Sequence, residues 1–344
     1  MRPKTFVAVL AVTAVSVVAA GYAVVSQSLS TSPVAGANTA VFPDLLAHAN
    51  DVQSITIVDA KGKATLQRQN GKWVYAEKGG YPAATEKIVK LAAALASLRY
   101  LEPKTDQPDR YGRLEVEDVD QKDAKSHLVT LAGADGKPLA SVIVGKQNYT
   151  LGDNGPGGVY VRIPGQPQAW LAEGSVDLPD DKIDWIARAV IDVKEADVQR
   201  VDFRPVGIPE LTVTKADRAV KEFTLAPLPE GKTADSDAVA RLGGAFGNLT
   251  LDDVRTDDAA LKPVAAGTVD LTTFEGVTVH ADLLSIDNAV WLRLKASGAE
   301  GNGDAGKQAK TINDAVGGWL FKVPQFKSSL LQPKVDDYLK KGES

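Results

Sequence analysis

The chain contains one stretch that resembles a phosphate-binding loop, the GNGDAGKQ of residues 301–308. Gly301, Gly306 and Lys307 have the spacing of a nucleotide-binding P-loop, in which backbone N–H groups and a lysine hold the phosphates. Gln308 stands where that loop requires a serine or threonine to bind magnesium. The preceding strand is also expected to belong to an antiparallel sheet, whereas such a loop connects a buried parallel strand to a helix. We therefore interpret the stretch as a polar surface connector and expect no bound nucleotide.

Other residue types with catalytic or metal-binding chemistry are scattered. The three histidines, His48, His127 and His280, lack the spacing of zinc ligands and adjoin no carboxylate signature, which indicates ordinary surface or hydrogen-bonded histidines. The aspartates of DVDQKD (residues 118–123) suggest a calcium loop, but Lys122 interrupts the pattern, so a solvated turn is expected. Because the chain also has no cysteine and no G-x-S-x-G elbow, we assign no catalytic residue and expect neither a metal nor a cofactor.

Two arginines and two tryptophans are the binding residues that the sequence suggests. Arg162 and Arg293 lie in mid-strand among apolar neighbours and are suited to hold an anionic ligand. The alternative is that each pairs with a carboxylate at a sheet surface. Trp170 and Trp319 are suited to anchor a protein partner or a sugar, with packing against the sheet as the alternative.

Composition sets the class of protein. The chain has 344 residues, of which 44% are hydrophobic and 24% charged, which is typical of a globular protein of about two domains. Its formal net charge is -5, and its basic residues are dispersed among acidic ones. Nucleic acid is therefore not an expected partner, since binding a phosphate backbone requires a basic surface.

The first residues predict a membrane anchor. Arg2 and Lys4 precede an uncharged, mostly apolar run over residues 6–25, which is long enough to cross a bilayer. We assign a transmembrane helix to residues 1–27 and a flexible linker to residues 28–50, with the remaining chain exported. The alternative is a signal peptide that is cleaved near Ala35-Gly36-Ala37.

The rest of the chain repeats itself. Matching segments recur in the same order: VQSITI from Val52 with VQRVDF from Val198, a helical apolar stripe over 88–98 with one over 239–249, VYVRI from Val159 with VWLRL from Val290, and Trp170-Leu171 with Trp319-Leu320. Alternating strands joined by short turns predict antiparallel sheets, and each unit contains one main helix. We expect an α+β fold of two tandem similar units, residues 51–193 and 197–340. The GNGDAGKQ stretch falls in a connector that the second unit lengthens.

Several motifs in the first unit resemble a known family. They are GKWVY at Gly71, the helix leading to LRYLEP, RYGRLE at Arg110, VIVGKQ at Val142 and GVYVRI at Gly158. With them the chain resembles the bacterial DUF 4340 family, a domain of unknown function, over most of residues 50–190 and more weakly in the second unit. The family prefers Tyr-Gly-Leu where this chain has Tyr-Gly-Arg-Leu from Tyr111, and the second unit lacks that motif. The resemblance implies an extracytoplasmic accessory of an ABC-type export system related to gliding-motility transporters, and it carries over no catalytic residue.

We expect a non-catalytic binding or assembly module that a single span anchors in the bacterial inner membrane. Both units would then be periplasmic, and ABC-type transporter subunits are the expected partners. The alternatives are a periplasmic ligand-binding protein and a hydrolase of cell-envelope polymers. Two facing acids about 5–9 Å apart in a cleft would favour the hydrolase.

Overall fold

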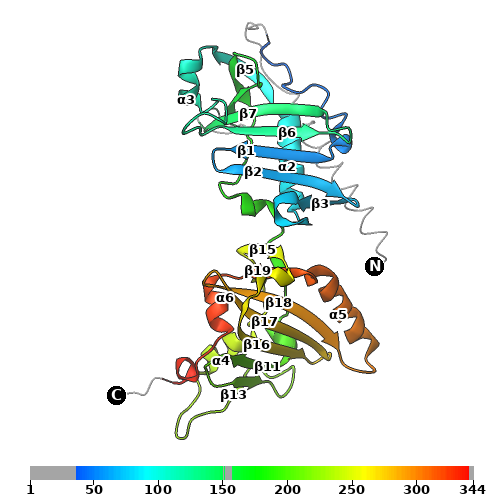
Figure 1. The fold of residues 1–344 in the computed structure, drawn as a ribbon, viewed down its shortest axis with the longest axis vertical. Coiled ribbons are helices and arrows are strands. Elements are labelled where there is room, and N and C mark those ends of the chain that lie inside the picture. Colours follow the sequence, from blue (N-terminus) through cyan, green and yellow to red (C-terminus); the bar gives the residue numbers. More distant parts are fainter. Residues whose placement is uncertain (1–35, 150, 152–156, 341–344) are drawn as a thin grey trace. The chain divides into compact units, whose positions relative to one another are not determined.

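The computed structural model describes residues 36–149, 151 and 157–340 (Figure 1). The chain divides into two compact units, of which the first ends at Ile186 and the second begins at Ala187. Antiparallel sheets dominate both, and helices are few. The predicted transmembrane helix of residues 1–27 lies outside the described residues. Within the described ranges, no helix is long and apolar enough to cross a membrane.

The first unit is built on a nine-stranded antiparallel sheet, in the order β4-β3-β2-β1-β6-β7-β8-β9-β5. Its strands are β1 (Ser54–Asp59), β2 (Gly62–Gln69), β3 (Lys72–Tyr75), β4 (Tyr81–Pro82), β5 (Arg99–Thr105), β6 (His127–Ala132), β7 (Pro138–Asn148), β8 (Gly158–Arg162) and β9 (Ala169–Glu173). Helix α2 (Thr85–Ser97), which lies behind the strands in Figure 1, buries Ile88, Leu91 and Leu95. The short helix α3 (Tyr111–Leu114) follows β5. The spacing of the three buried residues gives α2 one continuous apolar face.

The second unit is built on an eight-stranded antiparallel sheet, in the order β13-β12-β11-β16-β17-β18-β19-β15. Its strands are β11 (Val198–Pro205), β12 (Leu211–Thr214), β13 (Thr224–Ala226), β15 (Asp253–Thr256), β16 (Val264–Thr273), β17 (Val277–Ile286), β18 (Ala289–Gly298) and β19 (Trp319–Lys322). A separate pair joins β10 (Ala189–Ile191) to β14 (Leu249–Thr250). The helices are α4 (Ser236–Gly243), α5 (Gly303–Val316) and α6 (Gln325–Leu330).

The two sheets have the same strand order from β3 to β5 and from β13 to β15. Their registers agree as well, since Ile55 pairs with Leu131 in the first unit and Val201 with Leu271 in the second. All four side chains are buried. Because a slip of one residue would turn a strand's apolar side chains away from the core, the shared register places the same face of each sheet inward.

The closing segments of the two units also correspond. Ala83 bridges Ile186 at the end of the first unit, and Ala234 bridges Leu339 at the end of the second. Each bridge holds the segment before the main helix to the last residues of its unit. The two units therefore share their closing contacts as well as their sheets.

The units begin earlier in the chain than the sequence predicted. Val41, inside the predicted linker 28–50, is buried and donates its N–H to the carbonyl of Leu98. In the second unit, Leu251 donates to the carbonyl of Arg188, ahead of the predicted start at 197. These entry segments are too short to show a strand period, so their pairing has no signal in the sequence.

Helix α4 is shorter than the apolar stripe over 239–249 suggests. It ends at Gly243, where an added Cβ would lie 2.3 Å from Cζ of Phe223. Phe246 and Leu249 are nevertheless fully buried. The apolar pattern thus continues past the end of the helix through a turn at residues 244–248, in which Asn248 has a φ of +45°.

The prediction of a surface loop between β18 and β19 is wrong, because residues 303–316 form helix α5. Asn302 caps the helix by accepting hydrogen bonds from the N–H groups of Asp304 and Ala305. Lys307, the lysine of the P-loop-like stretch, is 81% exposed and pairs with Asp304 at 2.9 Å. Among the apolar residues of α5, only Ala305, Ala309 and Val316 are buried, which explains why the sequence showed little helical period.

Helix α5 covers a strand edge. β19 pairs with β18 only over residues 291–293, which leaves the rest of that β18 edge without a strand neighbour. There the side-chain amide of Asn313 donates to the carbonyl of Ala296 and accepts from its N–H, both at 2.8 Å. Gly298 allows the close approach, since an added Cβ would lie 2.4 Å from the backbone nitrogen of Gly306. The helix therefore satisfies backbone groups that an exposed edge would leave unpaired.

Candidate functional site

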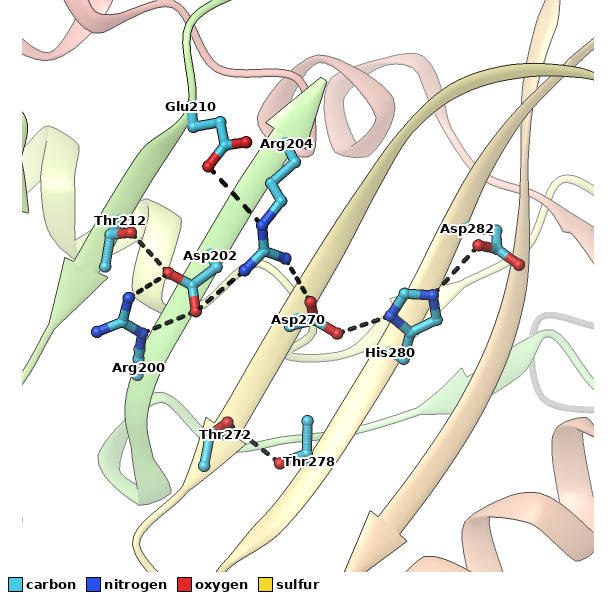
Figure 2. Close-up of polar contacts among 10 residues, drawn as sticks. All are labelled: Arg200, Asp202, Arg204, Glu210, Thr212, Asp270, Thr272, Thr278, His280 and Asp282. Carbon is cyan, nitrogen blue, oxygen red and sulfur yellow. Dashed lines mark hydrogen bonds and ion pairs between the residues drawn. The ribbon is translucent and has the colours of Figure 1, made fainter. Parts of the chain in front are cut away.

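A row of charged and polar side chains crosses one face of the second unit's sheet (Figure 2). We call this surface the charged face. Its members come from β11, β12, β16, β17 and β18 and from the residue after β15: Arg200, Asp202, Arg204, Thr212, Asp257, Asp270, His280, Asp282 and Arg293. Figure 2 shows these residues except Asp257 and Arg293. Because strand side chains alternate, Val201 and Phe203 point into the core while their neighbours point to this face.

The row begins at Asp202 on β11. Its carboxylate accepts hydrogen bonds from Nε and Nη2 of Arg200, both at 2.7 Å, and from the hydroxyl of Thr212 at 2.6 Å. Burial alone would raise the pKa of Asp202, but the bonds from Arg200 and Thr212 and the charges of Arg200 and Arg204 outweigh it and hold the pKa below its ordinary value. Asp202 is therefore a fixed anion at neutral pH.

The row continues across β16 and β17. Arg204 donates to Asp270 at 2.5 Å, and Nδ1 of His280 lies 2.6 Å from the same carboxylate. Nε2 of His280 lies 3.2 Å from Asp282. Asp270 pairs directly with His280 in the ladder, so the backbone register itself sets this contact.

The row ends at Arg293 on β18. This arginine donates to both oxygens of Asp257, at 2.6 and 2.8 Å, and to Asp282 at 3.3 Å. The hydrogen bonds from Arg293 lower the pKa of Asp257, and burial opposes them only in part. A planar guanidinium forked onto a carboxylate is a strongly oriented contact. Arg293 thus pairs with carboxylates at a sheet surface, as the alternative interpretation of the sequence held.

The same ladder positions in the first unit carry hydroxyl groups. Thr130, which pairs with Thr56 on β1 and with Ser141 on β7, occupies the place of Asp270. Its hydroxyl lies 3.1 Å from that of Ser141, where the second unit has the contact between Asp270 and His280. The ion-pair row is therefore a property of the second unit, and the matching ladder positions of the first unit carry uncharged hydroxyl groups.

Arg162 and Arg293 occupy equivalent positions but have different surroundings. Arg162 pairs with Ile143 in its ladder, whereas Arg293 pairs with Asp282. Arg162 is 4% exposed, while the side chain of Arg293 is 40% exposed. The anionic-ligand role predicted for Arg162 would therefore require the segment that covers it to move.

That covering segment contains the RYGRLE motif. Arg162 donates from Nε to the carbonyl of Val116 at 2.8 Å and from Nη2 to Asp118 at 2.5 Å. Its guanidinium carbon lies 4.5 Å from the centre of the Tyr111 ring. At Gly145 an added Cβ would lie 2.3 Å from the carbonyl oxygen of Leu114. Residues of RYGRLE, VIVGKQ and GVYVRI thus meet in one place, where they hold the segment against the sheet.

The two predicted tryptophans lie on the other face of each sheet from these arginines. Trp170 pairs with Val161, the neighbour of Arg162, and Trp319 precedes Leu320, which pairs with Arg293. Because side chains alternate along a strand, neither tryptophan shares a surface with the arginine of its unit. The structure therefore does not bring the four predicted residues into one site in either unit.

Trp170 contacts the chain's own entry segment. Its ring centre lies 4.7 Å from that of Tyr100, and an added Cβ on Gly36 would lie 3.1 Å from the indole. Gly36 has a φ of +94°, which glycine adopts without the strain that other residues would incur. The first-unit surface predicted to anchor an external partner is thus occupied in part by residues before β1.

The register also corrects the predicted match between Trp170 and Trp319. Arg162 pairs with Ala169, and Arg293 pairs with Leu320. Ala169 therefore corresponds to Leu320, and Trp170 to Phe321 rather than to Trp319. The two Trp-Leu dipeptides are identical, and matching them put the predicted correspondence two residues out of register.

The ion pairs of His280 were not predicted from the sequence. Its carboxylate neighbour on the same strand, Asp282, stands two residues away, which is the spacing of side chains on one face of a strand. That spacing was the available signal for a contact between the two side chains. The patterns for zinc ligands and helix faces compare residues three or more positions apart and therefore do not include it. The other two histidines also meet carboxylates: His48 lies 2.8 Å from Asp51, and His127 lies 3.6 Å from Asp59.

The described carboxyl groups with shifted pKa values are stabilised as anions. Every carboxyl group whose pKa clearly departs from its ordinary value is shifted down, namely Asp59, Asp135, Asp202 and Asp257. A glycosidase acid needs a pKa that is shifted up. In the described part of the chain, no group of three or more histidine, aspartate or glutamate residues is arranged to hold a metal ion.

Comparison with known proteins identifies a family. No curated protein matches the chain. The model of the family described as Domain of unknown function (DUF4340) matches residues 73–266, from β3 to the first residues of β16. The match includes Tyr111, Gly145 and Arg162, whose contacts hold the RYGRLE segment in place. Since it covers more than half of the 344 residues, the chain belongs to the DUF4340 family.

Proposed function

We propose that this protein is a non-catalytic binding or assembly module whose charged face, on the second unit, docks a protein partner. The supporting observation is the row of ion pairs that crosses a half-exposed sheet face, where the first unit has threonine and serine. The row is held by side chains from neighbouring strands, so its charges are already in place before a partner arrives. Pre-positioned charges of alternating sign favour rapid encounter and a single docking register.

We also infer that the two units arose by duplication. The shared strand order, register and closing bridges support this inference. In the first unit, the segment that Arg162 holds covers part of the corresponding face. The second unit carries the charged face, which makes it the better candidate for docking.

The proposed location is the bacterial inner membrane, with both units in the periplasm beside an ABC-type export system. The apolar run over residues 6–25 and the two basic residues before it support a single-span anchor. The resemblance to DUF 4340 proteins supports the accessory role. A hydrolase of cell-envelope polymers is less well supported, because every carboxyl group with a shifted pKa in the described residues is stabilised as an anion. A catalytic acid needs a pKa that is shifted up.

Site-specific photo-cross-linking of the full chain in its native membrane tests this proposal. A photoreactive residue at Lys295, which is exposed on β18 opposite His280, should capture a transporter subunit. The matched control is Lys63, an exposed lysine of β2 on the equivalent face of the first unit. Capture from Lys295 and not from Lys63 supports docking through the charged face. Equal capture from both positions, or capture from neither, would refute it.

A further inference from the structure

Both ring nitrogens of His280 face carboxylate oxygens. Nδ1 lies 2.6 Å from Oδ1 of Asp270, and Nε2 lies 3.2 Å from Oδ1 of Asp282 (Figure 2). A neutral imidazole has a single N–H, so one of its nitrogens would present a lone pair to a carboxylate. Only the protonated ring donates to both. The geometry therefore matches an imidazolium.

The neighbouring charges give this proton a defined place in the row. On β11, Arg204 pairs with Asp270, and on β18, Arg293 pairs with Asp282. With His280 protonated, cations and anions alternate without interruption from Arg204 to Arg293. Without the proton, two carboxylates flank a neutral ring and the face gains one net negative charge.

Lys295 on β18 also pairs with His280 in the ladder, and it is exposed. Burial lowers the pKa of His280, but the hydrogen bonds and charges of Asp270 and Asp282 outweigh it, and the pKa is raised above its ordinary value. The histidine then changes charge above about pH 6.5.

We propose that His280 is a proton-dependent link in the charged face, and that loss of its proton leaves Asp270 and Asp282 one cation short, so that they bind a basic side chain of a partner. In the protonated state the imidazolium supplies that positive charge and the face is internally paired. In the neutral state a lysine or arginine of the partner supplies the missing positive charge. This inference rests on the proposed function, because it regulates docking through the same face.

The first experiment measures the titration of His280 in the full chain. The chain contains three histidines, so histidine-specific isotope labelling gives three sets of imidazole NMR signals, and His280→Gln assigns one set. We expect the His280 pKa to lie above the ordinary value of about 6.5 and to fall in Asp282→Asn. His127 should titrate below that value, since burial lowers its pKa. A His280 pKa at or below the ordinary value would overturn the inference.

The second experiment measures binding of N-terminally acetylated hexalysine, a peptide whose charge is constant between pH 5 and 8 because it has no free α-amino group. The full chain should bind it on the order of two- to fivefold more tightly above the His280 pKa than below it, as expected for one surface charge. In His280→Gln the change in affinity over this range should be clearly smaller than in the wild type. Ser141→Ala, at the position of His280 in the first unit, is the matched control and should keep the wild-type dependence. An unchanged dependence in His280→Gln would overturn the inference.

The titration of His280 and the photo-cross-linking at Lys295 together separate this inference from the proposed function. If His280 titrates as expected but Lys295 captures no transporter subunit, the proton-dependent link stands and the assembly role fails. If Lys295 captures a subunit but His280 is neutral below pH 6, the docking surface stands and its regulation by His280 fails.

Discussion

At the scale of residues, the same ladder position carries an arginine in both units, but the arginine is buried in the first unit and half-exposed in the second. Arg162 and Arg293 start from equivalent places, but Ile143 lies opposite the first and Asp282 opposite the second. The apolar neighbour allows a segment to pack over Arg162, whereas the acidic neighbour keeps Arg293 in a half-exposed ion-pair row. The partner across the strand thus decides whether the arginine holds the fold together or faces solvent.

Substitution of these two arginines should therefore have unequal effects. Arg162→Met removes the donors to Val116 and Asp118 and the contact with the Tyr111 ring, all at a buried position. We expect it to lower the free energy of unfolding by about 2–4 kcal/mol. Arg293→Met, at the equivalent but half-exposed position, should cost about 1 kcal/mol or less. Urea denaturation of both variants measures the difference, and equal costs would contradict the contrast in burial.

The proton of His280 should also appear in the stability of the chain. Because the folded-state pKa is raised, its contribution is fully present below the unfolded value of about 6.5 and is lost as the pH rises through the folded value. At this half-exposed site we expect the contribution to be below about 1 kcal/mol. Urea denaturation between pH 5 and 8 should show a difference between wild type and His280→Gln that shrinks with rising pH. A difference that grows with pH would contradict the assigned sign.

At the scale of elements, segments outside the sheets are held by close backbone approaches and amide contacts. Gly145 lets the RYGRLE segment lie against β7, and Gly298 lets α5 lie against β18. Asn313 then supplies the hydrogen bonds that a neighbouring strand would make. Both segments are polar enough to be mistaken for loops, and contacts with strands far away in the chain hold them in place.

Gly145→Ala should destabilise the first unit. Its Cβ would lie 2.3 Å from the carbonyl oxygen of Leu114 and 2.6 Å from that of Glu115, so the segment must move away. We expect a loss of about 1–3 kcal/mol in the free energy of unfolding. Gly112→Ala, in the same segment with no atom within 4 Å of the added Cβ, is the control and should be neutral or slightly stabilising in helix α3. Thermal and urea denaturation compare the two.

Asn313→Ala should expose the edge that α5 covers. The change removes both partners of the Ala296 peptide group and should cost about 1–3 kcal/mol. Lys310→Ala, on the exposed side of the same helix, loses only a surface ion pair with Asp314 and should cost less than about 0.5 kcal/mol. Faster hydrogen exchange at Ala296 in the first variant and not in the second would confirm the role of Asn313. Unchanged exchange would refute it.

At the scale of the whole molecule, the chain forms two compact units that share one topology, and each has its own entry segment. The second unit begins with β10, whose pairing with β14 uses residues before the predicted start at 197. The entry segment of the first unit likewise makes contacts through Val41. A unit is therefore complete only when the segment ahead of its first sheet strand is included.

Fragments of the chain test this boundary. A fragment of residues 187–344 keeps β10 and should unfold cooperatively in urea. A fragment of residues 197–344 loses the hydrogen bonds from Leu251 to Arg188 and from Val193 to Phe246, with the pairing of Ile191. We expect it to be less stable by about 2 kcal/mol or more, since several backbone bonds and apolar contacts are lost together. Equal stability of the two fragments would place the boundary at 197.

The sequence by itself determined what depends on neighbours in the chain. The alternation of VQSITI predicts a strand, the stripe of Ile88, Leu91 and Leu95 predicts the main helix, and the recurring segments indicate two similar units. The motifs around RYGRLE also pointed to the family that the comparison found. These signals are local because strand and helix periods are set by the backbone geometry of a few successive residues.

Only the tertiary structure decided which side chains meet. Asp270 and His280 lie opposite each other because β16 and β17 pair in one register, and a slip of one residue would put them on different faces. Strand register also puts Trp170 and Arg162 on opposite faces of their sheet. Tertiary packing of α5 against β18 places Asn313 beside Ala296. Charge pairs between strands leave no period in the sequence, since each partner is selected by the pairing of segments that lie far apart along the chain.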